Sequence, residues 1–150
     1  MPQNVQLEED LSSFIREREE VYQATQQIKP RRLQPRRNES TNRLELSVCR
    51  SSGLSEPQLW AICAEHFDPR QKLPAIGRCV APASKVFGVG LEIDADGRPY
   101  PQHANVIGWK DEPGRPENEI KHHWLDQTQR MAKHFKFQRR SNFVSIKSQD

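Results

Sequence analysis

Hydrophobic residues in the first 28 positions recur with a helical spacing. They lie three, four or seven positions apart, which places them on one stripe of an α-helix: Leu7, Leu11, Phe14, Val21 and Ile28. The pattern predicts an amphipathic helix over residues 5–28. Such a narrow stripe needs a partner surface, which belongs either to this chain, to a second copy or to another protein.

Residues 29–42 cannot continue this helix. Pro30 and Pro35 lack an amide donor and favour extended geometry in the residues before them. Four arginines accompany the prolines: Arg31, Arg32, Arg36 and Arg37. We therefore predict an extended basic arm. It either lies on an acidic surface or a phosphate backbone, or is a solvated linker.

The central part of the chain shows strand and helix patterns in turn. Residues 43–50 alternate apolar and polar side chains, which is typical of a half-buried strand. Ser55 and Gln58 form a capping-box sequence and predict the start of a helix that ends near Phe67. Shorter strands are expected over residues 75–81, 91–94 and 104–109, and a second helix begins near Pro116.

These elements predict an α+β fold, because each amphipathic element must bury its apolar face. We expect a small mixed sheet of three to four strands with two packed helices, preceded by a separate N-terminal amphipathic helix. The predicted divisions are an N-terminal helix (1–28), a basic Pro/Arg arm (29–42), a compact α+β domain (43–137) and a basic tail (138–150).

Composition narrows the class of protein. The chain has 150 residues, an apolar fraction of 34% and a net charge of +3, which suits one domain with polar ends. Basic residues concentrate in two segments, 29–37 and 121–150, around a mildly acidic body. No signal sequence is recognisable, and no run approaches the ~18 apolar residues of a membrane span. We therefore expect a cytoplasmic protein that does not enter a membrane.

The stretch over residues 101–109 gathers imidazole, amide and indole groups. We select His103, Asn105 and Trp109 as candidate binding residues. On a strand, His103 and Asn105 share one face. They either bind a ligand or satisfy backbone groups. If the mouth of the strand meets the start of the following helix, His103, His122 and Asp68 form a cluster, and a histidine oriented by a carboxylate is the arrangement of a general base.

Motifs for the common catalytic and cofactor sites are missing from the sequence. There is no glycine-rich phosphate loop, nucleophile elbow or metalloprotease motif. The three cysteines form no Cys-x-x-Cys pair, and His122 and His123 would point ~100° apart on a helix. We predict no cofactor and no metal, and the sequence does not favour an enzyme.

Several segments together resemble a group of small bacterial proteins that have no established activity. They are an ELSV-x-R strand at 45–50, a GLS sequence at 53–55 before a helix with Trp60, Gly90-Leu91, and HANVIGW at 103–109. The resemblance covers roughly residues 29–132. The chain departs from the group at Lys110, where a proline often follows the tryptophan, and in its acidic N-terminal segment. The resemblance implies a bacterial origin and a stand-alone domain or component of a mobile-element or defence gene cluster.

Three functions remain open on these observations. The first is a binding or adaptor module that docks on another protein, or on a second copy of itself, through the N-terminal helix and the basic arm. The second is a nucleic-acid-binding accessory protein that uses the arm together with Lys136, Arg139 and Arg140. The third is a hydrolase that uses His103 and Asn105.

Overall fold

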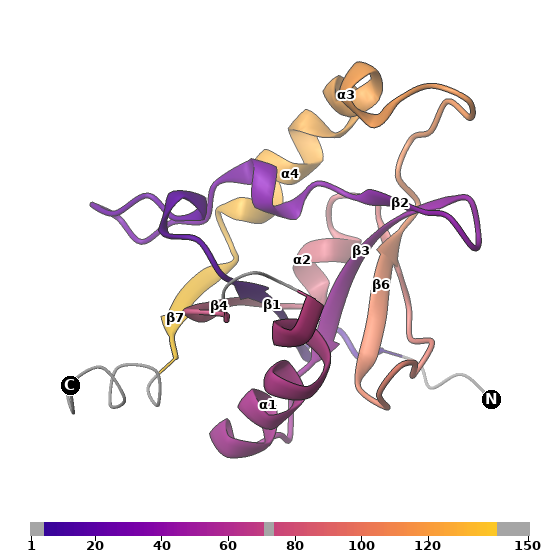
Figure 1. The fold of residues 1–150 in the computed structure, drawn as a ribbon. Helices are drawn as coiled ribbons and strands as arrows, with labels where there is room; N and C mark the ends of the chain where they lie inside the picture. Colours follow the sequence, from indigo (N-terminus) through magenta and orange to yellow (C-terminus); the bar gives the residue numbers. More distant parts are fainter. Residues whose placement is uncertain (1–4, 71–73, 141–150) are drawn as a thin grey trace.

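The structure, a computed structural model, describes residues 5–70 and 74–140 (Figure 1). Within these residues the strands form one seven-stranded sheet with antiparallel pairing throughout, in the order β5-β6-β3-β1-β4-β7, and β2 pairs with β3 beside this path. The strands are β1 (Asp10–Ile15), β2 (Arg36–Asn38), β3 (Arg43–Arg50), β4 (Gly77–Pro82), β5 (Glu92–Asp94), β6 (His103–Ile107) and β7 (Lys136–Arg139).

Helical segments cover both faces of the sheet (Figure 1). On one face lie α1 (Glu56–Ile62), the π-helical turn η3 (Cys63–Phe67) and η4 (Asp68–Arg70). On the other face lie α3 (Glu117–Ile120), η5 (Lys121–Trp124) and α4 (Leu125–Ala132). The shorter helical turns are η1 (Arg18–Glu20), η2 (Pro30–Leu33) and α2 (Ser84–Phe87).

The N-terminal segment differs most from the structure predicted from the sequence. It forms no helix over residues 5–28; instead it supplies β1, which lies between β3 and β4. Leu11 and Ile15 are fully buried on the α4 side of the sheet, whereas Phe14 packs on Trp60 of α1 on the other side. Residues four apart share a face in a strand as they do in a helix, so their spacing fits both. The expected sheet of three to four strands with a separate N-terminal helix is wrong.

Most residues of the predicted docking stripe are buried in the chain's own core. Leu11, Phe14, Val21 and Ile28 are all buried, and Val21 and Ile28 face each other across an isolated β-bridge. Leu7 is the one member that stays exposed, with 59% of its surface accessible. The stripe therefore cannot serve as a partner helix.

Residues 29–38, which we call the strap, also differ from the extended arm that the prolines predicted. The strap contains η2 and β2, and Leu33 at the end of η2 is fully buried beside α4. Both guanidinium nitrogens Nη1 and Nη2 of Arg37 donate to the carboxylate of Asp111, at 3.0 and 2.6 Å. The strap is thus packed on the body through an apolar anchor and an ion pair.

The central predictions agree with the structure. β3 spans residues 43–50 as the alternation predicted, and Leu44, Leu46 and Val48 are buried in the larger core. Ser55 caps α1, and its capping box with Gln58 is complete, with hydrogen bonds of 2.9 and 3.2 Å. Part of the predicted basic tail forms β7 at the edge of the sheet, and residues 141–150 lie outside the described residues.

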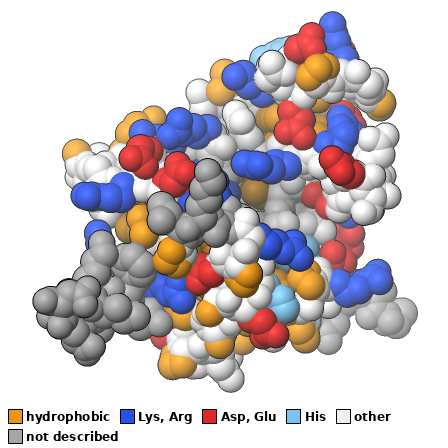
Figure 2. Space-filling model, in the orientation of Figure 1, with side chains coloured by type: hydrophobic (Ala, Val, Ile, Leu, Met, Phe, Trp, Pro, Cys, Tyr) orange, Lys and Arg blue, Asp and Glu red, His pale blue; other side chains and the backbone are white. Residues whose placement is uncertain are grey.

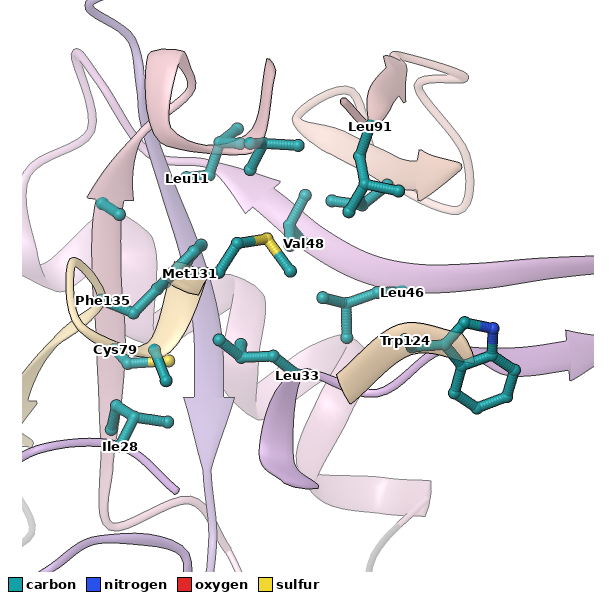
Figure 3. Close-up of a cluster of buried hydrophobic side chains, with 14 of the residues drawn as sticks. Leu11, Ile28, Leu33, Leu46, Val48, Cys79, Leu91, Trp124, Met131 and Phe135 are labelled. Atoms are coloured by element: carbon teal, nitrogen blue, oxygen red, sulfur yellow. The ribbon is translucent and has the colours of Figure 1, made fainter. Parts of the chain in front are cut away.

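The larger core fills the space between the sheet and α4. Figure 3 shows the side chains of β1, β3 and β4 directed toward those of α4 and the strap, among them Leu11, Leu33, Val48, Met131 and Phe135. A smaller core on the opposite face joins Phe14 and Cys49 to Leu59, Trp60 and Cys63 of the α1 stretch.

The pairing along one edge of β3 is interrupted, and the candidate site lies at this interruption. Pairing between β1 and β3 ends at Ser12 and Cys49, and β2 takes over the same edge of β3 only from Glu45. Over residues 46–48, β3 pairs with β6 on its other edge while β1 turns away toward β4. The sheet therefore opens between β1 and β3, beneath the strap.

Candidate functional site: a basic pocket beneath the strap

The opening between β1 and β3 holds a pocket of about 890 Å³. Residues 12–14 of β1 and 45–49 of β3 form its walls, the strap covers one side, and the turn containing His66 and the loop before β6 bound the other. In Figure 2, which shows this face, Lys and Arg side chains border a hollow near the centre of the molecule. The site therefore lies where backbone pairing is interrupted, and its lining is rich in charge.

All three glutamates that line the pocket are engaged by other groups. Glu20 pairs with Arg32 at 3.2 Å. Glu45 pairs with Arg43 and accepts a hydrogen bond from the Asn38 amide at 2.8 Å. Glu117 accepts a 2.6 Å hydrogen bond from the backbone amide of Arg37. Two of the three carboxylates are thus paired with arginines, and the third accepts from a backbone amide.

Several arginines of the lining lack such a partner. Among the described residues, no carboxylate lies within ion-pair distance of Arg31, Arg36 or Arg70, and the only hydrogen bond of the Arg31 guanidinium is to the Glu19 carbonyl oxygen at 3.2 Å. Arg16 also lines the pocket, with Glu17 at a long 3.7 Å. The pocket therefore carries positive charge that the fold leaves uncompensated.

His103 forms part of the wall at the β6 end. Its Nδ1 lies 2.7 Å from Oδ1 of Asp96, and the Asn105 amide donates to Oδ2 of the same carboxylate at 3.1 Å. A carboxylate at this position accepts the Nδ1 proton and fixes the tautomer, so that the Nε2 lone pair is the remaining acceptor. Nε2 makes no hydrogen bond within residues 5–70 and 74–140, although the residue is only 8% exposed.

Local folding explains this pair. β5 and β6 form an antiparallel ladder, so the turn after β5 returns Asp96 beside the start of β6. The amide of Gly97 donates to the His103 carbonyl oxygen at 3.1 Å, and Gly97 takes a positive φ of 66° that suits a residue without Cβ. His103 and Asn105 alternate with the buried Ala104, which places both polar side chains on the Asp96 side.

Tyr100 connects His103 to a second histidine. Its ring meets His103 edge-on at 5.4 Å between centroids, and the His66 ring lies 4.8 Å away on a tilted plane. His66 belongs to the π-helical turn η3, a geometry that changes side-chain direction and occurs often at functional sites. Two imidazoles from distant parts of the chain therefore reach the same pocket.

Cys49 faces His103 directly across the β3–β6 pairing but is not an activated nucleophile. Burial raises the pKa of its thiol to about 11, so the sulfur stays protonated at neutral pH. Burial likewise raises the pKa of the Tyr100 hydroxyl. Both groups act as neutral parts of the wall.

Two buried polar atoms near the pocket have no hydrogen-bond partner among the described residues. They are Ser13 Oγ and Arg78 Nε. Arg78 donates through Nη1 to Ser12 Oγ at 2.6 Å, and Ser12 Oγ in turn contacts Ser51 Oγ at 2.8 Å. A further guanidinium without a carboxylate partner in the described chain, that of Arg78, thus lies behind the β1 wall.

The structure separates the residues selected from sequence into two groups. His103, Arg31, Arg32 and Arg36 line the pocket, and Asn105 supports it through Asp96. Trp109 lies in the core instead, where its indole donates to the Val106 carbonyl at 2.9 Å and its ring meets Trp124. Arg37 is held by Asp111.

The cluster of His103 with Asp68 or His122 does not form. Asp68 instead accepts from Arg140 at 3.1 Å and from the Ala75 amide at 2.9 Å. His122 is exposed on η5, and its ring lies tilted against that of His123, with the centroids 4.1 Å apart. The basic residues Lys136 and Arg139 lie on β7, and neither lines the pocket.

Sequence reasoning missed the carboxylate that holds His103. Asp96 lies in the Asp-Ala-Asp-Gly sequence at 94–97, and a turn between two paired strands returns its residues to the start of the second strand. The position of Asp96 in a turn between two predicted strands was therefore a signal present in the sequence. No comparable signal existed for His66 and Tyr100, because their approach depends on how α1 packs on the sheet.

Comparison with protein-family models, with curated proteins and with solved structures finds no match for this chain. The described part of the chain contains no group of three or more His, Cys, Asp or Glu side chains placed to hold a metal ion. No helix in residues 5–70 and 74–140 has the length and apolar character needed to cross a membrane.

Proposed function

We propose that this protein binds a phosphate-bearing nucleotide in the pocket beneath the strap. The observation that carries the proposal is the charge imbalance of the lining. Its glutamates are all engaged, whereas Arg31, Arg36 and Arg70 have no carboxylate partner within the described chain. An anionic ligand supplies the missing charge.

The chemistry of the lining favours phosphate among anions. Guanidinium groups donate in a planar fork that matches two oxygens of a phosphate. A volume of about 890 Å³ lies within the ~300–1,000 Å³ that small-molecule sites usually occupy. Tyr100 and His66 add aromatic faces of the kind on which a nucleobase stacks. These features together support a nucleotide rather than a bare inorganic anion.

The adaptor function expected from sequence has lost its structural basis. It relied on an exposed N-terminal helix and a projecting basic arm. Residues 10–15 are a central strand, and the strap is anchored by Leu33 and by the Arg37–Asp111 ion pair. Three of the four arginines expected to meet a partner protein, Arg31, Arg32 and Arg36, thus line a pocket in the chain itself.

Titration calorimetry with the full chain tests the proposal. We expect pyrophosphate and nucleoside monophosphates to bind, with nucleotides tighter than pyrophosphate, and we expect affinity to fall as ionic strength rises. Arg36 is solvent-exposed at the pocket, so Arg36→Gln removes one solvated phosphate contact and should weaken binding about five- to tenfold. Arg139→Gln is the matched control, because Arg139 is exposed on β7 away from the pocket.

Two results would refute nucleotide binding. One is the absence of heat or of any thermal-shift response with all these probes at millimolar concentration. The other is equal affinity of the Arg36→Gln and Arg139→Gln variants, which would place any anion binding outside the pocket.

A further inference from the structure

The pocket holds two histidines in positions suited to proton transfer. His103 has its Nδ1 fixed by Asp96, and its Nε2 makes no hydrogen bond in the described chain. His66 lies across Tyr100, with both imidazole centroids within 5.4 Å of the tyrosine ring. A general base and a general acid within one site are the minimum that a proton-shuttling reaction requires.

The same pocket has no activated nucleophile of its own. Cys49 is fully buried, and the pKa of its thiol is raised to about 11. Ser12 is held by Ser51 and Arg78, and Ser47 contacts Asn105 at 3.4 Å. Ser13 also lines the pocket, and its buried Oγ makes no hydrogen bond in the described chain, so none of the three serines is hydrogen-bonded to a histidine there. The pocket thus suits a substrate that carries its nucleophile with it.

RNA is such a substrate, because each ribose places a 2′-hydroxyl next to the phosphodiester that it can attack. We propose that the nucleotide bound beneath the strap is a residue of single-stranded RNA, and that His103 and His66 cleave the strand there. This inference rests on the proposed nucleotide binding and names its substrate class.

The step balances without any further reactant. His103 Nε2 takes the proton of the 2′-hydroxyl, and the 2′-oxygen forms a bond to the adjacent phosphorus. The bond from phosphorus to the 5′-oxygen of the next nucleotide breaks, and protonated His66 gives its proton to that oxygen. The products are a 2′,3′-cyclic phosphate and a 5′-hydroxyl end, and solvent then restores the two imidazoles.

The arginines and Asp96 have separate tasks in this scheme. Charge accumulates on the phosphate oxygens during attack, and guanidinium groups such as Arg36 stabilise it. Asp96 does not touch the substrate; it is a positioning residue that holds the His103 tautomer with Nε2 available.

The test uses the full chain and a fluorescently labelled single-stranded RNA, with products identified by mass spectrometry. We expect fragments ending in 2′,3′-cyclic phosphate. His103→Gln and His66→Gln should each slow cleavage by about 10²–10⁴-fold. His122→Gln is the matched control, since His122 is exposed on η5 outside the pocket. Asp96→Asn should lower kcat and leave KM within about twofold, because its role lies in the proton transfer rather than in binding.

Circular dichroism will show whether each variant folds. If the variant of the buried His103 does not fold, the variant of the partly solvated His66 still tests the inference. A fully 2′-deoxy strand of the same sequence should bind but remain uncut. Binding without cleavage of the RNA overturns the inference and leaves nucleotide binding intact. Cleavage of the deoxy strand, or undiminished cleavage by a folded His66→Gln variant, overturns it as well.

Discussion

Replacing Leu33 with alanine tests whether the strap is part of the fold. Leu33 is fully buried between the sheet and α4, and its neighbours in the core include Met131 and Phe135. The substitution removes three carbon atoms from water-free surroundings, worth about 0.8 kcal/mol each. A cavity that the surroundings fill only partly adds to this, so we expect a loss of about 3–4 kcal/mol in unfolding free energy.

Urea unfolding followed by tryptophan fluorescence measures this loss, because Trp109 and Trp124 lie in the same core. We expect a lower midpoint at an unchanged slope, and a melting temperature lower by about 10 °C or more. Leu125→Ala is the control: Leu125 lies on α4 but is 49% exposed, and its replacement should cost less than about 1 kcal/mol. Equal costs for the two variants would mean that the strap is a solvated linker after all.

Two further predictions concern the sheet and its acid stability. Gly77→Ala should cost about 2 kcal/mol in chemical denaturation, because a Cβ there would collide with the Gln138 carbonyl and the Phe137 ring of β7, and an undiminished midpoint would contradict the β4–β7 pairing. Hydrogen bonding with Arg50 holds the pKa of Glu9 below its usual 4.5, so this pair stabilises the protein above that pH and the contribution is lost as pH falls through the lowered value. Melting curves of Glu9→Gln should therefore lie below those of the parent at neutral pH and converge with them in acid, and a gap that persists at low pH would refute the linkage.

The sequence was informative where one residue pattern had one structural solution. Ser55 and Gln58 define a helix start through contacts three residues apart, and the alternation over residues 43–50 fits only a strand. The first 28 residues had two solutions, since Leu11 and Ile15 share a face in either element. Pairing with β3 and β4, from sequence positions far downstream, decided between them.

The same distinction between local patterns and long-range contacts applies to the candidate site. His103 and Asn105 were visible as neighbours on one strand face, because alternation is local. The pocket itself arises from the divergence of β1 and β3. Because residues 10–15 were predicted to be helical, this divergence could not be predicted. The same error made the strap look unsupported, since burial of Leu33 depends on α4, which lies almost a hundred residues later.

The position of β1 has a consequence for misfolding. Because β3 and β4 do not pair with each other, β1 is the only strand that joins β5-β6-β3 to β4-β7 along the described sheet. Its release in a local fluctuation would split the sheet and uncover two hydrogen-bonding edges at once. Such edges recruit strands from neighbouring molecules. Mutations that loosen β1 should therefore promote aggregation before they abolish the fold.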